Sequence, residues 1–217
     1  MFLSWSAFYE GRSDALYFNV LIPRLLEEII REEGIRPCDV GILPSVEFGV
    51  SKRTFDVVAK EICDRKDEFH VIFIHADLGG RALGETVHQR REALINKAVE
   101  ICEFNAALAV LLSPEKELEA WVLADHAAIM AAFGISEIPD GLLPANPREA
   151  ERLPDPKSTL QNITRVVSGG KRSASQILVR VAQEQNINEL RRARSFQAFE
   201  KSLKGALKNL RFIQNQK

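Results

Sequence analysis

Acidic side chains follow several apolar runs of this sequence at the point where each run ends. Glu10 follows the first run, Asp77 follows the third, and Glu117 and Glu119 follow the fourth. Carboxylates that converge from separate strand ends repel one another, and a hard divalent cation held by oxygen ligands relieves that repulsion. These acids therefore predict a site for a cation such as Mg²⁺, which could polarise a phosphoryl group and activate water for in-line attack.

Three further residues near these acids are interpreted as supporting residues of the site: Asp14, His75 and Asp125. Asp14 lies in the first turn of an expected helix, where the helix dipole by itself favours an acid. Asp125 falls on the apolar face of its helix, so we expect it to be buried and hydrogen-bonded. A buried acid at this position either orients a metal ligand or caps a neighbouring loop, and both alternatives stay open.

The pattern of apolar residues predicts the elements that would position the acids. Continuous apolar runs typical of buried strands alternate with segments of helical periodicity, the runs lying at 3–9, 38–43, 70–74 and 106–112 and the helical segments at 13–30, 53–63, 85–103 and 113–132. This alternation predicts an α/β fold with a parallel sheet of about four strands flanked by helices. Ligands of such sheets bind outside the carboxyl ends of the strands, which is where the acids lie.

A proline-rich stretch divides the chain into parts of opposite charge. Residues 1–135 are the expected α/β domain, 136–157 a proline-rich connector, and 158–217 an all-helical C-terminal region. Residues 1–150 contain 15 basic and 25 acidic residues, whereas residues 151–217 contain 14 basic and 5 acidic residues. The basic end indicates either a polyanionic or acidic partner, or a helical tail folded onto its own acidic body, with about equal weight.

Composition and the motifs that do not occur exclude several classes. The chain has 217 residues, of which 46% are hydrophobic and 27% charged, as in ordinary globular proteins, and no apolar run is long enough to span a bilayer. We therefore expect a soluble, cytoplasmic protein with no membrane partner. The sequence motifs of P-loop ATPases, dinucleotide dehydrogenases, zincins and α/β-hydrolases do not occur. Three cysteines, Cys38, Cys63 and Cys102, have no metal-ligand spacing and are expected to be reduced and partly buried.

The acidic segments resemble those of a known family. The Glu-Gly turn at 10–14, the sequence His75-Ala76-Asp77 and the acidic run at 117–125 are similar to the TOPRIM domain of topoisomerases, primases and nucleases of the overcoming-lysogenization-defect type. With the Asp-Pro-Lys sequence at 155–157 and the segment 195–199, nearly the whole chain resembles a bacterial TOPRIM-like family of unknown function. The Glu-x-Glu-Ala-Trp run that begins at Glu117 is the most specific of these segments.

The resemblance implies a TOPRIM or Rossmann-like fold and a metal-dependent phosphoryl-transfer site. It implies that Glu10 is the catalytic acid or base, Asp77 the second acid of an Asp-x-Asp pair, and Glu119, with Glu117 nearby, the third acidic position. His75 stands where the family usually presents the first Asp of that pair. Because imidazole is a poor ligand for Mg²⁺ and an acceptable one for Mn²⁺, this departure implies either a changed metal preference or a degenerate site.

The leading expectation is a Mg²⁺- or Mn²⁺-dependent nuclease that acts on DNA or RNA, as part of an anti-phage defence system with an ATPase partner. The candidate phosphate contacts are the basic residues that flank the acidic loops or follow Gly169-Gly170, namely Arg12, Arg81, Lys171 and Arg172. Two alternatives are a catalytically degenerate binding or regulatory subunit of an ATPase complex, and an enzyme that acts on a nucleotide or small phosphoester. The sequence leaves open whether the chain forms a homo-oligomer.

Overall fold

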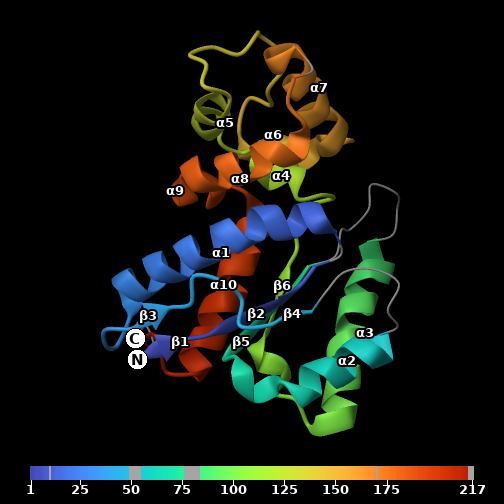
Figure 1. Ribbon diagram of the computed structural model, residues 1–217, viewed down its shortest axis with the longest axis vertical. Coiled ribbons are helices and arrows are strands. Elements are labelled where there is room, and N and C mark those ends of the chain that lie inside the picture. Colours follow the sequence, from blue (N-terminus) through green and yellow to red (C-terminus); the bar gives the residue numbers. More distant parts are fainter. Residues whose placement is uncertain (10, 49–54, 76–83, 170, 215–217) are drawn as a thin grey trace.

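Strands and helices alternate along the first half of the chain, and the described part of the second half is helical (Figure 1). The computed structural model describes residues 1–9, 11–48, 55–75, 84–169 and 171–214. The strands are β1 (Phe2–Leu3), β2 (Trp5–Phe8), β3 (Asp39–Val40), β4 (Glu47–Phe48), β5 (Val71–His75) and β6 (Ala109–Leu112). The α-helices are α1 (Arg12–Glu33), α2 (Phe55–Asp64), α3 (Gly84–Cys102), α4 (Glu119–Val122), α5 (His126–Phe133), α6 (Pro147–Arg152), α7 (Pro156–Ser168), α8 (Ala174–Glu184), α9 (Ile187–Leu190) and α10 (Arg194–Asn209).

All strand pairs of the described residues are parallel, which confirms the predicted mixed α/β architecture with parallel strands. The larger sheet has the order β4-β2-β5-β6, and a separate small sheet pairs β1 with β3. The prediction that the four apolar runs form one sheet is wrong, because the run at 38–43 supplies β3 of the small sheet. β4, which was not predicted, pairs with β2 instead. The first run is divided at Ser4, whose amide donates to Nδ1 of His70 at 3.1 Å.

The larger sheet buries apolar side chains on both of its faces. Along β5, Val71 and Phe73 belong to a hydrophobic cluster that includes α1 and α10. Ile72 and Ile74, which alternate with them, belong to a second cluster built with α2 and α3. Because successive side chains of a strand point to opposite faces, the sheet lies between these two pairs of helices (Figure 1).

The C-terminal helices continue the core of the α/β part. The predicted apolar face of α10 is buried, with Phe196 and Leu203 at 0% exposure, and the ring of Phe199 lies 6.2 Å from that of Phe73 in β5. α8 packs against both α1 and α5, and α10 packs against β6. A single hydrophobic cluster therefore extends from Leu3 to Ile213.

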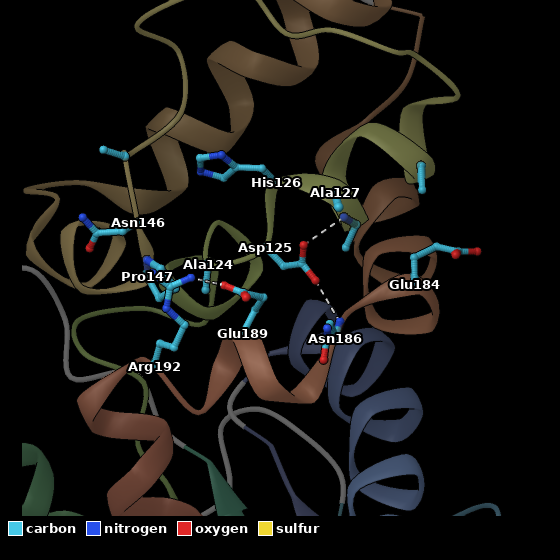
Figure 2. Close-up of a pocket in the computed structure, with 13 residues that line it drawn as sticks. Ala124, Asp125, His126, Ala127, Asn146, Pro147, Glu184, Asn186, Glu189 and Arg192 are labelled. Atoms are coloured by element: carbon cyan, nitrogen blue, oxygen red, sulfur yellow. Dashed lines mark hydrogen bonds and ion pairs between the residues drawn. The ribbon is translucent and has the colours of Figure 1, made fainter.

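The helix expected at 113–132 is two helices that begin later. Lys116 has a φ of 65°, a left-handed conformation that no α-helix accommodates, and α4 starts only at Glu119. Asp125, expected inside the helix, instead has extended backbone and is the N-cap of α5, accepting a hydrogen bond from the amide of Ala128 at 3.1 Å (Figure 2). The prediction that a helix starts at Ser113-Pro114 was wrong, because the left-handed backbone of Lys116 interrupts a helix there.

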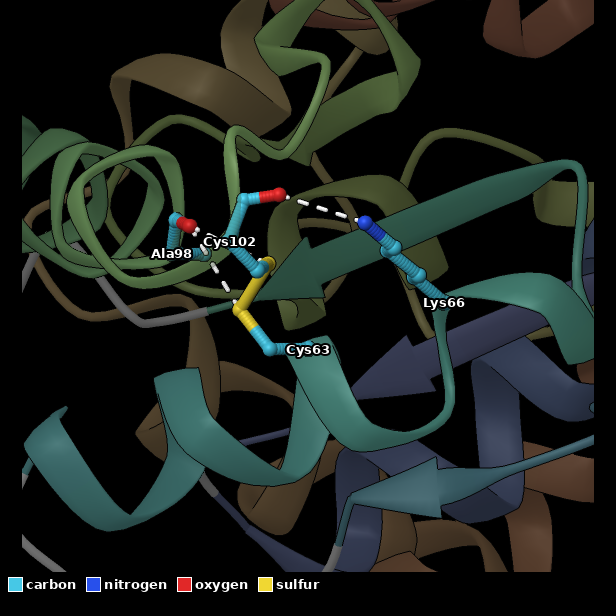
Figure 3. Close-up of a disulfide and its surroundings, with 4 residues drawn as sticks. All are labelled: Cys63, Lys66, Ala98 and Cys102. Atoms are coloured by element: carbon cyan, nitrogen blue, oxygen red, sulfur yellow. Dashed lines mark hydrogen bonds between the residues drawn. A yellow bond between two sulfur atoms is a disulfide. The ribbon is translucent and has the colours of Figure 1, made fainter.

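Two of the cysteines are joined, which corrects the prediction of three reduced thiols. Cys63 in α2 and Cys102 at the end of α3 form a disulfide, with their Cα atoms 5.8 Å apart (Figure 3). Nζ of Lys66 donates to the carbonyl oxygen of Cys102 at 3.2 Å beside it. Cys38 is free and half-buried. The sequence carries no signal for this pair because 39 residues separate its members.

No helix within the described ranges combines the length and the apolar character that crossing a membrane would require.

Replacing Phe199 by alanine is expected to destabilise the protein by about 3–5 kcal/mol, because it leaves a cavity where α10 meets the sheet. Urea denaturation followed by far-ultraviolet circular dichroism measures this change. Lys201→Ala, on the exposed side of the same helix, is the matched control and is expected to stay within about 0.5 kcal/mol of the wild type. Equal stability of the two variants would contradict the integration of α10 into the core.

A thiol titration tests the cysteine assignment. The oxidised protein, unfolded in denaturant without reductant, is expected to react at one thiol per chain, since only Cys38 is free. The same protein after reduction is expected to react at all three cysteines. Three reactive thiols before reduction, in protein purified under air, would show that Cys63 and Cys102 are not bonded.

Candidate functional site

The carboxyl ends of β2, β5 and β6 lie at one edge of the sheet. The three strands are parallel, with Phe8 opposite Ile74 and His75 opposite Leu112. In Figure 1, α1 begins at this edge, close above the ends of the strands. This is the place where open parallel sheets bind ligands, so it is the candidate site.

Asp14 and His75 meet at this edge inside the protein. Asp14 is 3% exposed and His75 is fully buried, and Oδ2 of Asp14 lies 3.7 Å from Nε2 of His75. Oδ2 of Asp14 also accepts a hydrogen bond from the amide of Gly11, the N-cap of α1, at 2.7 Å. Nδ1 of His75 lies 3.2 Å from the carbonyl oxygen of Leu112 in β6. The pair therefore links the start of α1 to the ends of two strands.

The ring of His75 is packed among aromatic side chains. Its centroid lies 4.8 Å from that of Phe18 in α1. Phe18 in turn contacts the indole of Trp121 in α4, with centroids 6.0 Å apart in an edge-to-face arrangement. The position that the family resemblance assigns to a metal-binding carboxylate is thus occupied by a buried side chain that connects three elements.

The two glutamates of the acidic run have different surroundings. Glu119 is the first residue of α4 and is 7% exposed. Glu117 is only half-buried, and its Oε2 accepts a hydrogen bond from the backbone amide of Lys157 at the start of α7, at 3.1 Å. Glu119 is therefore the buried acid of the run, while Glu117 helps to attach α7.

Asp125 caps backbone on two sides, which decides between the alternatives left open by the sequence. Besides the amide of Ala128, it accepts a hydrogen bond from the amide of Asn186 at 2.8 Å, and so connects α5 to the start of α9. Figure 2 shows its carboxylate between these two amides, at a pocket of about 530 Å³. The pocket is lined by alanines of α5 and by the ion pair of Glu189 with Arg192.

The predicted phosphate contacts also differ from one another. Nη1 of Arg172 donates to the carbonyl oxygens of Ala132 and Phe133, at 3.1 and 3.4 Å, and so binds the carboxyl end of α5. Its assignment as a phosphate contact stays a prediction. Lys171 and Arg12 are exposed, and Arg12 lies in the first turn of α1, next to the candidate site.

Glu10, Asp77 and Arg81 lie outside the described residues, so their assignments stay predictions. Across the ranges that are described, no group of three or more His, Cys, Asp or Glu residues is placed to hold a metal ion. The predicted set of Mg²⁺ or Mn²⁺ ligands thus stays a prediction too. Of the predicted ligands that the structure describes, Glu119 is the buried one.

Sequence reasoning missed two buried polar side chains that hold this region together. Gln185 is fully buried, accepts from the Tyr17 hydroxyl at 2.6 Å and donates to the carbonyl oxygen of Trp121 at 2.6 Å. Burial raises the pKa of Tyr17, so its phenol stays a donor. Glu151 accepts from the hydroxyl of Ser195, which itself accepts from Nε1 of Trp121 at 2.7 Å. No local signal marks either residue, because each lies in a polar stretch of sequence.

Comparison with protein-family models, with curated proteins and with solved structures finds no match to this chain.

Asp125→Ala is expected to lower the free energy of unfolding by about 1–2 kcal/mol, because the backbone amides of Ala128 and Asn186 lose their acceptor. Chemical denaturation measures it, and Asp140→Ala, an exposed acid outside the described helices, is the control. A variant as stable as the control would show that the Asp125 cap contributes little.

Proposed function

We propose that this protein is a divalent-metal-dependent nuclease of TOPRIM-like fold, with its site at the carboxyl ends of β2, β5 and β6. The observation that carries the proposal is the meeting of Asp14, in the first turn of the helix that follows β2, with His75, at the end of β5. Glu10 precedes this helix in the sequence and Asp77 follows His75 by two residues. In the sequence, the two proposed catalytic acids, Glu10 and Asp77, are therefore close to two residues, Asp14 and His75, that lie next to each other in the structure.

Glu119 supplies the third acid of the proposed site. Its carboxylate is largely withdrawn from water at the start of α4, so a cation bound there would interact with it more strongly than in water. Oxygen donors of this kind suit both Mg²⁺ and Mn²⁺. When bound, such a cation supplies charge that stabilises the phosphoryl group under attack. Asp14 then serves as a positioning residue, since its carboxylate fixes the start of α1 beside the site.

Two exposed basic side chains, one of them beside the site, would contact the phosphates of the substrate. Arg12 lies in the first turn of α1, and Lys171 lies between α7 and α8. Each phosphate contact adds an electrostatic contribution to the affinity for nucleic acid. This contribution weakens as the salt concentration rises and does not depend on the nucleotide sequence.

One observation favours a second candidate function, a degenerate TOPRIM-like subunit that binds nucleic acid without cutting it. His75 is fully buried, and both of its ring nitrogens face protein groups, Leu112 and Asp14. A side chain held in this way is suited to a structural role. The cleavage assay described next distinguishes the nuclease from the degenerate subunit.

The assay is cleavage of labelled single- and double-stranded DNA and RNA with Mg²⁺ or Mn²⁺, and with EDTA as the metal-free control. Glu119→Gln keeps the size of the side chain and removes its charge, so we expect cleavage to fall by about 10²–10⁴-fold, the range that a positioned catalytic acid or base supplies. Glu115→Gln, an exposed acid four residues earlier, is the matched control and should cut as the wild type does.

Equal cleavage by the Glu119 and Glu115 variants would remove Glu119 from the site. Binding of a polymer by a wild type that cuts nothing in either metal would favour the degenerate subunit. Circular dichroism and the unfolding midpoint of each variant establish that any loss does not come from misfolding.

A further inference from the structure

The end of α1 away from the candidate site carries a group of exposed apolar side chains. We call it the N-terminal patch, and its members are Met1, Phe2, Ile35, Ile42 and Leu43. Ile42 is 77% exposed and Leu43 is 67% exposed, which is unusual for aliphatic side chains of this size. Figure 1 shows β1, β3 and the carboxyl end of α1 together at this end of the molecule.

Contacts of the backbone hold the patch together. Phe2 pairs with Asp39 in the small sheet, and the amino group of Met1 donates to the carbonyl oxygen of Pro37 at 3.1 Å. A Cβ atom placed on Gly41 would lie 3.5 Å from Cζ of Phe2, so the phenyl ring covers the chain just before Ile42. Met1 and Phe2 are therefore fixed beside the segment that leads to Ile42 and Leu43, and exposed apolar groups of this kind mark interaction sites.

The segment 39–48 borders this surface and, among the described strands, pairs with other strands on one side only. β3 has β1 as its only strand partner among the described residues, and β4 lies at the end of the larger sheet. The amides of Asp39, Gly41 and Ser45 all donate to the β1–β2 side, to carbonyl oxygens of Met1, Leu3 and Trp5. Pro44 has no amide hydrogen, which disfavours the addition of another strand here. An occupant of this surface therefore packs through side chains.

The charged side chains beside the patch comprise two cations and two anions, so their net charge is zero. Glu27, Arg31, Arg36 and Asp39 line an adjoining pocket of about 520 Å³, which also contains Ile35. Within the described ranges, none of these four side chains forms an ion pair. A nucleic acid or a strongly charged protein would need one sign of charge, whereas two cations and two anions beside an apolar surface can complement a second copy of the same surface.

We propose that the N-terminal patch is the contact between two copies of this chain, related by a two-fold axis. In such a contact each patch meets its own equivalent, so Ile42 and Leu43 pack against apolar side chains of the second copy. Arg31 and Arg36 then lie against the partner's Glu27 and the partner's Asp39. The 22 residues of α1 separate this contact from the candidate site by about 33 Å, so both sites of a dimer stay open.

Sedimentation velocity of the full chain over a concentration series tests the proposal. The wild type is expected to reach twice the chain mass of 24.4 kDa, and the double variant Ile42→Glu with Leu43→Glu is expected to stay at one chain mass. Val166→Glu changes an exposed apolar residue of α7 outside the patch, and this control should dimerise as the wild type does.

Charge reversal provides a second, more specific arm. Arg36→Glu and Asp39→Arg are each expected to weaken the dimer, and the two together should recover part of it, because opposite charges then face each other again. A wild type that stays at one chain mass at every concentration would overturn the proposal, as would a dimer that the Ile42 and Leu43 changes leave intact. Nuclease activity does not enter these measurements, so they are independent of the proposed function.

Discussion

A parallel sheet whose strands are apolar on both sides must be covered on both faces, and the rest of this fold depends on that constraint. The alternation of Phe73 with Ile72 and Ile74 in β5 creates two separate apolar surfaces. α2, which follows β4, and α3, which follows β5, cover one of them, but α1 shares the other with α10, the last helix of the described residues. The segment after α10 consequently meets the carboxyl end of α1, where Gly34 is bridged to Ile213.

Covering the sheet with distant helices creates polar junctions that must be satisfied inside the core. Gln185 fills one such junction by joining Tyr17 of α1 to the backbone of α4 at Trp121. The indole of Trp121 in turn donates to Ser195 at the start of α10. An unpaired donor or acceptor at any of these points would cost about 1–3 kcal/mol. The same contacts hold α4, and with it Glu119, against the helices packed on the sheet.

The charge asymmetry of the sequence is partly used within the fold. Arg191 forms ion pairs with Glu28 of α1 and with Glu200, at 2.6 and 2.7 Å, and the hydrogen bonds to Glu200 raise the pKa of this guanidinium. Lys204 pairs with Glu33, near the end of α1, at 2.7 Å. For Arg191 and Lys204, the interpretation of the basic end as a helical tail folded onto the acidic part of the same chain is therefore the correct one. Lys171 and Lys201 remain exposed and are the kind of residue that a polyanion could still engage.

The sequence by itself determined those features that depend on neighbouring residues: the apolar strands β5 and β6, the amphipathic face of α10, and the burial of Asp125. It also indicated that acids follow the strands, although Glu10 and Asp77 stay predictions. Only the tertiary structure decided which partner each polar group has. Asp125 meets an amide 61 residues away, Arg191 a carboxylate 163 residues away and Tyr17 an amide 168 residues away. Periodicity reports which face of a helix or strand is buried, because that depends on spacing along one element, whereas a hydrogen bond depends on how separate elements pack.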